Sequence, residues 1–144
     1  MNRSLVLAVL LAIALWSSAP ATRADDLKAL EGKWKVETAE AQGKPAEAPE
    51  LRELIVTITG DRYEILVNGE TDRGSLKLDE MQKPKFMDAT DTEGENVGKV
   101  IKAIYEVTGD TLRVCYAMKG DERPTEFATK EGTSLLLITY RREK

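Results

Sequence analysis

Apolar and polar residues alternate along most of the chain. In "KWKVETAE" (33–40), Trp34, Val36 and Thr38 fall on one face and mostly charged residues on the other. An alternation with period two is typical of a β-strand that buries one face. No helix-period segment of useful length competes with it, so the pattern predicts an all-β protein.

Turn signals divide the apolar runs into hairpins. The stretch "ELIVTITGDRYEILVNGE" (53–70) contains two apolar, β-branched runs joined at Gly60-Asp61, and the second ends at Asn68-Gly69. Asn-Gly between two such runs is the strongest short hairpin signal, because both central residues of a type I′ turn need a positive φ. These two strands and the next one therefore form consecutive hairpins.

The remaining strands follow the same alternation. Residues 72–80, 83–90 and 133–142 each read as one strand, and 97–118 reads as a long hairpin that turns at Gly109-Asp110. The inward positions of that hairpin are predicted to be Ile101, Ala103, Tyr105, Val107, Leu112, Val114, Tyr116 and Met118. Residues 123–132 are irregular. The total is eight or nine strands.

Eight short antiparallel strands in chain order are compatible with a closed barrel or a two-sheet sandwich. We predict an up-and-down antiparallel β-barrel, because every hairpin joins neighbours in sequence and closure removes exposed sheet edges. Before the first strand, "DDLKALEG" predicts a short helical turn that Asp25 or Asp26 caps and Gly32 ends.

The first 24 residues have the composition of a secretory signal peptide. Arg3 precedes an apolar run of 12 residues, Leu5 to Trp16, and small residues follow it. The run is too short for a membrane helix, which needs about 20 residues. We predict cleavage after Ala24 or Ala21 and export to the periplasm or the exterior, with 25–144 as a single domain; an uncleaved anchor is the alternative.

Charge and composition exclude several classes of function. Without Arg3 and Arg23, 19 basic residues stand against 25 acidic ones, a net charge of about −6. We expect no nucleic-acid partner and no integral membrane segment after signal cleavage. The chain has no histidine, which excludes His-dependent catalysis and imidazole metal sites. The single cysteine, Cys115, lies in the strand-like "LRVCYAM" and is predicted to be buried.

Four ordered stretches carry a family resemblance: "LEGKWKVETAEAQGKP", "ITGDRYEI", "GDTLRVCYA" and "RPTEFATKEG". Over residues 27 to 142 the chain resembles a family of small, mostly uncharacterised secreted bacterial domains, abundant in planctomycetes and described as lipocalin-like. The resemblance implies a lipocalin-like β-barrel and no assigned activity. In lipocalins a Gly-x-Trp opens the first strand and a basic residue near the last strand packs over that Trp. Here the barrel-closing residues would be Gly32, Trp34 and Arg141 or Arg142, of which we assign Arg141.

The same comparison predicts where a ligand would bind. Residues 41–53 are longer than a tight turn requires and would fold over the barrel mouth, which places Leu51 and Leu54 at its rim; a loop without this role is the equal alternative. The candidate ligand-binding residues are Leu51, Leu54, Tyr63, Phe86, Tyr105, Tyr116 and Phe127. A barrel of eight strands is only just wide enough to be filled by its own side chains, so each of these is also a candidate core residue.

The acidic stretch "DATDTEGEN" (88–96) suggests calcium, but aligning Gly94 with the EF-hand glycine puts Ala89 and Val100 at ligand positions. We therefore expect a solvated acidic hairpin loop, no metal and no cofactor. The leading hypothesis is a non-enzymatic barrel that binds a small apolar molecule. The alternative is a filled barrel that serves as a structural or protein-interaction module of the cell envelope, and a carboxylate-dependent enzyme is a third, weaker hypothesis.

Overall fold

The computed structural model describes residues 24–94 and 96–144, so the predicted signal peptide lies outside the described residues except for Ala24. The described chain begins with a helix and continues as nine strands and one further short helix. In order these are α1 (Ala24–Leu30), β1 (Gly32–Ala41), β2 (Lys44–Pro45), α2 (Pro49–Arg52), β3 (Ile55–Thr59), β4 (Arg62–Val67), β5 (Glu70–Asp79), β6 (Lys85–Glu93), β7 (Val100–Thr108), β8 (Thr111–Ala117) and β9 (Leu135–Arg142).

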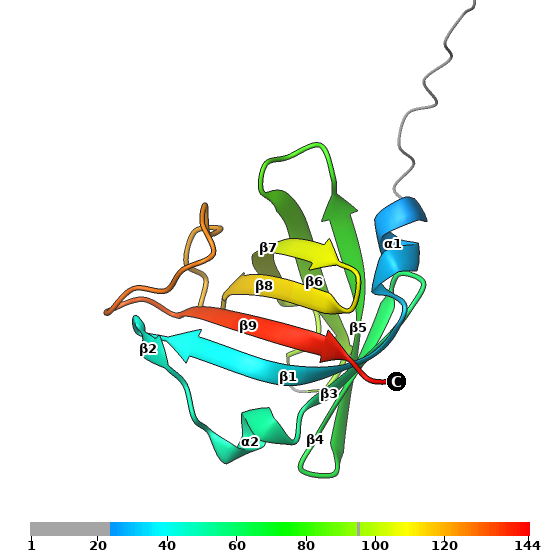
Figure 1. Cartoon of the computed structure of the whole chain (residues 1–144), viewed down its shortest axis with the longest axis horizontal. Coiled ribbons are helices and arrows are strands. Elements are labelled where there is room, and N and C mark those ends of the chain that lie inside the picture. Colours follow the sequence, from blue (N-terminus) through cyan, green and yellow to red (C-terminus); the bar gives the residue numbers. More distant parts are fainter. Residues whose placement is uncertain (1–23, 95) are drawn as a thin grey trace, which may run out of the picture.

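The strands form a closed up-and-down barrel, as predicted. From β3 to β9 each strand pairs antiparallel with the next, β1 pairs with β3, and β9 returns to pair with β1. Figure 1 shows β9 running beside β1, where the first and last strands complete the barrel. The two-residue β2 adds only a short edge to β1, so eight strands make the wall. Closure leaves no exposed edge along these eight strands.

Turn chemistry sets the hairpins where the sequence predicted them. Asn68 and Gly69 both have positive φ, 50° and 77°, and join β4 to β5. Gly60 (φ 59°) joins β3 to β4, and Gly109 (φ 57°) joins β7 to β8. Side chains of one parity then face the barrel interior and form its hydrophobic core.

One prediction within β1 is wrong. The pairing of β1 with β9 shifts between Val36 and Thr38, which leaves Thr38 exposed and turns Ala39 towards the core. A β-bulge adds one residue to a strand and so reverses the facing of everything beyond it. Strict alternation placed Thr38 on the buried face because a bulge leaves no mark in an apolar pattern.

The prediction that the acidic stretch 88–96 is a solvated hairpin loop is also wrong, because most of it is part of a strand. β6 continues through Glu93 and pairs with β5, with a register shift between Arg73 and Gly74. The shift leaves Thr92 as an extra residue, so that Asp91 faces the interior while Glu93 pairs with Arg73 outside, at 3.1 Å.

The two ends of the barrel differ. α1 covers one end, which we call the closed end: Leu30 is fully buried there, and Tyr105 donates a hydrogen bond to Asp26 Oδ2 at 2.6 Å. Lys85 pairs with the same oxygen at 2.8 Å. β2 and α2 lie at the other end of β1 (Figure 1), which we call the mouth. Neither described helix is long and apolar enough to cross a membrane.

The segment 120–134 packs on the outside of the barrel. Arg123 stacks on the Phe86 ring at 4.2 Å from its centroid, pairs with Asp88 at 2.6 Å and donates to the Ala103 carbonyl at 2.8 Å. Beneath this segment Cys115 is fully buried, as predicted, with its Sγ 3.6 Å from the Ala128 carbonyl oxygen. The outer cover explains why this face of the barrel is apolar.

Candidate functional site

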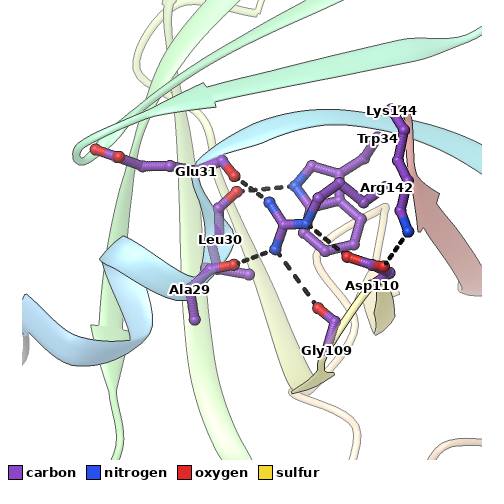
Figure 2. Close-up of polar contacts among 8 residues, drawn as sticks. All are labelled: Ala29, Leu30, Glu31, Trp34, Gly109, Asp110, Arg142 and Lys144. Carbon is purple, nitrogen blue, oxygen red and sulfur yellow. Dashed lines mark hydrogen bonds and ion pairs between the residues drawn. The ribbon is translucent and has the colours of Figure 1, made fainter.

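The closed end is sealed by an arginine that lies on a tryptophan. Figure 2 shows the Arg142 guanidinium against the Trp34 ring, and its central carbon is 4.3 Å from the ring centroid. Trp34 is fully buried, and its Nε1 donates to the Leu30 carbonyl at 2.8 Å. The pair therefore fixes the end of α1 to the base of the barrel.

Hydrogen bonds hold Arg142 in this place. Its guanidinium donates to the carbonyls of Ala29, at 2.6 Å, and Glu31, and it pairs with Asp110 at 3.2 Å. A Cβ on Gly32 would lie 2.9 Å from Arg142 Nη1, and Gly32 has a φ of 126°, so the glycine makes room for the arginine.

The assignment of this role to Arg141 is wrong. Arg141 is adjacent in the strand, so its side chain points to the opposite face, where it pairs with Glu37 at 3.3 Å. The register of β9 against β1, which pairs Trp34 with Arg142, decides between the two arginines and was not predicted.

Between the closed end and the mouth the barrel is hollow. The cavity has a volume of about 330 Å³ and reaches the mouth, where Leu51, Leu54, Asn96 and Met118 lie. Aliphatic side chains from the surrounding strands form most of its wall, among them Val56, Ile58, Leu76, Ile101, Val114 and Ile138. The interior is thus a largely apolar space that the barrel's own side chains leave unfilled.

A tyrosine and a carboxylate meet on one side of the cavity. The Tyr63 hydroxyl donates to Asp91 Oδ1, and Gly74 lies between their strands. A Cβ on Gly74 would overlap the Tyr63 ring, so only glycine lets the ring cross the strand to reach Asp91. Burial, together with the adjacent Asp91, raises the pKa of Tyr63 far above its ordinary value, and the hydroxyl keeps its proton.

A second polar pair stands on the opposite strands. The hydroxyls of Tyr116 in β8 and Tyr140 in β9 are 2.8 Å apart, and either one can be the donor. Burial raises the pKa of Tyr116 to about 12 and that of Tyr140 well above its usual range. Two hydroxyls that share one hydrogen bond leave one proton over, so this pair retains a donor for a third group.

Four of the predicted ligand-binding residues line the cavity: Leu51, Leu54, Tyr63 and Tyr116. The other three do not, and their assignment is corrected. Tyr105 is buried at the closed end against Asp26, Phe86 lies outside under Arg123, and Phe127 lies outside with Arg113 4.3 Å from its ring centroid.

Sequence reasoning missed the two carboxylates that line the cavity, Asp72 and Asp91, and Gly74, which lets the Tyr63 ring reach Asp91. Asp72 and Gly74 share the parity of Leu76 in β5, which alternation alone could have indicated. Asp91 shares the parity of Met87 and was hidden by the interpretation of its segment as a loop.

In the described part of the chain no three His, Cys, Asp or Glu side chains are grouped so as to hold a metal ion. Comparisons with protein-family models, with curated proteins and with solved structures found no match for this chain.

Proposed function

We propose that this protein is an exported, lipocalin-like carrier that binds one small, largely apolar molecule inside its barrel, without catalysis. The observation that carries the proposal is the cavity of about 330 Å³. An apolar cavity of about 150 Å³ is enough to bind benzene. A space about twice as large that opens at the mouth suits a compound of two or three aromatic rings or a medium alkyl chain.

The cavity also has the composition of a binding site for a small molecule. Such sites combine an apolar wall with a few polar groups that fix orientation. Here the polar groups are the Tyr63–Asp91 and Tyr116–Tyr140 pairs. The Leu51 and Leu54 side chains at the mouth are placed to cover a molecule inside. Their position supports a lid role for the segment between β1 and β3.

Export and family membership belong to the same proposal. The composition of residues 1–24 supports secretion, and the closed eight-stranded barrel with an arginine over a tryptophan at its base is compatible with the lipocalin-like family that the sequence resembles. Binding is favoured over catalysis because the chain has no histidine and the four tyrosine and aspartate side chains of the two polar pairs are engaged in hydrogen bonds within those pairs.

Uptake of an uncharged fluorescent probe, N-phenyl-1-naphthylamine, tests the proposal. We expect saturable fluorescence enhancement with one probe per protein. Ala89→Leu adds side-chain volume to the cavity wall and should reduce uptake at least severalfold, whereas Ala29→Leu makes the same change on the exposed face of α1 and should not. Equal uptake by both variants, or no uptake by the unmodified protein, would contradict a binding site inside the barrel.

A further inference from the structure

The charged groups of the cavity are all of one sign. Its lining includes two carboxylates, Asp72 and Asp91, and among the described residues neither a lysine nor an arginine. Among the basic side chains of the neighbouring strands, Arg73 points outward and pairs with Glu64 and Glu93 at 3.2 and 3.1 Å, and Lys85 lies at the closed end, where it pairs with Asp26 at 2.8 Å. An anion entering the cavity would therefore meet negative charge with no compensating partner.

The two carboxylates lie on the same side of the cavity, on the neighbouring strands β5 and β6. Asp91 lies opposite Gly74, and Asp72 follows two positions along the same face of β5, towards the mouth. Asp72 is exposed, with its Oδ1 beside Gly94, and Asp91 is half-buried below it. After burial, both carboxylates contribute to the raised pKa of Tyr63, which agrees with their placement around its hydroxyl.

Part of the hydrogen-bonding capacity on this side of the cavity is unused by the described residues. Tyr63 donates to Oδ1 of Asp91, which leaves Oδ2 able to accept. A carboxylate beside an apolar wall loses hydration, and a cation at hydrogen-bonding distance restores the lost stabilisation. The side of the cavity formed by β5 and β6 is thus complementary to a positively charged donor, and the aliphatic wall is complementary to an apolar body.

We propose that the ligand is an apolar amine: its hydrocarbon part lies against the aliphatic wall, and its ammonium group lies towards the mouth between Asp91 and Asp72. The inference rests on the proposed function and narrows it to a chemical class. Fatty acids and other carboxylates are disfavoured by the same geometry. The Tyr116–Tyr140 pair offers its remaining proton to an acceptor deeper in the ligand.

Three ligands with one alkyl chain and different head groups test the proposal: octylamine, octanol and octanoate. Like lysine, the amine is protonated at pH 7. A charged hydrogen bond contributes about 1.5 to 3 kcal/mol, which corresponds to roughly tenfold or more in affinity. We therefore expect octylamine to displace N-phenyl-1-naphthylamine with a Kd about tenfold lower than that of octanol, and octanoate to bind more weakly than either.

Matched variants separate the cavity carboxylates from the general negative charge of the protein. The double variant Asp72→Asn, Asp91→Asn keeps an oxygen acceptor for Tyr63 and should bring octylamine to within about twofold of octanol. Asp61→Asn removes a carboxylate from the exposed turn at the closed end and should leave the preference intact. The preference should also weaken in high salt.

The outcomes are distinguishable. If octanol binds and octylamine has no advantage, or if its advantage survives in the double variant, the amine assignment is overturned while the binding function stands. If the probe and all three ligands fail to bind, the proposed function fails as well. Circular dichroism checks that each variant is folded, so that a loss of binding is not caused by unfolding.

Discussion

Raising the pH should unfold this protein through its tyrosines. The chain has four, and all of them lie in the barrel: Tyr63, Tyr105, Tyr116 and Tyr140. Burial raises the pKa of each, and hydrogen bonds to Asp91 and Asp26 add to the effect at Tyr63 and Tyr105. In the unfolded chain each would titrate near its ordinary value of about 10.

The sign follows from the proton balance. Above pH 10 the unfolded chain loses protons that the folded barrel retains, so the free energy of unfolding falls as pH rises. At about pH 11, one unit above the unfolded value, each tyrosine that stays protonated reduces this free energy by about 1.4 kcal/mol. The four together remove about 5 to 6 kcal/mol, which is comparable to the whole stability of a small domain, about 5 to 15 kcal/mol.

An alkaline titration followed by circular dichroism and by tyrosinate absorbance measures this effect. We expect both signals to change together in one cooperative transition, with little tyrosinate before unfolding. Lysines also titrate in this pH range, and the variant Tyr140→Phe isolates the contribution of one tyrosine. Between pH 8 and pH 11 the free energy of unfolding of this variant, measured by urea denaturation, should fall by about 1.4 kcal/mol less than that of the unmodified protein. Tyrosinate absorbance with a midpoint near pH 10 in a protein that is still folded would refute the reasoning.

Three further predictions concern single side chains. Arg142→Ala removes the hydrogen bonds to the end of α1 and should lower the free energy of unfolding by about 2 to 4 kcal/mol in urea denaturation. Arg141→Ala breaks only an exposed ion pair and should lower it by less than about 1 kcal/mol. Equal losses in the two variants would contradict the role of Arg142 in closing the barrel. Gly74→Ala should displace the Tyr63 ring, lower stability by roughly 1 to 3 kcal/mol and weaken probe uptake; unchanged uptake would show that the ring position does not shape the cavity. The Cys115 thiol, whose pKa is raised by burial, should react with a thiol reagent only as fast as the protein opens, and a reaction as fast as that of a free thiol would contradict its burial.

The sequence predicted the barrel because its dominant signals are local. Alternation shows which side chains share a face, and Asn68-Gly69 and the other turn glycines fix the pairing of neighbouring strands. The choice of a closed barrel over a sandwich rested on the absence of long crossovers, and the pairing of β9 with β1 confirms it. As predicted, Leu51 and Leu54, from the long segment after β1, line the cavity at its mouth.

The errors arise where one residue changes the facing of a strand. Thr38 was misplaced because the bulge in β1 depends on pairing across the seam of the barrel. Phe86 was assigned to the interior by the size of its ring, but in the structure Met87 faces the cavity and Phe86 faces outward. The residue that covers Phe86 there, Arg123, comes from a segment without regular structure. Asp91 was missed because an acidic stretch resembles a loop until its partner strand is known. Long-range register and packing thus decided these positions, and local pattern could not supply them.

The central claim is that the barrel is a container, and native mass spectrometry of the protein purified from the exported fraction of its own host tests it most directly. The native mass should exceed the denatured mass by one small molecule, which denaturation releases and which the emptied protein takes up again from a host extract. A native mass equal to that of the polypeptide alone, with nothing taken up from the extract, would contradict the claim.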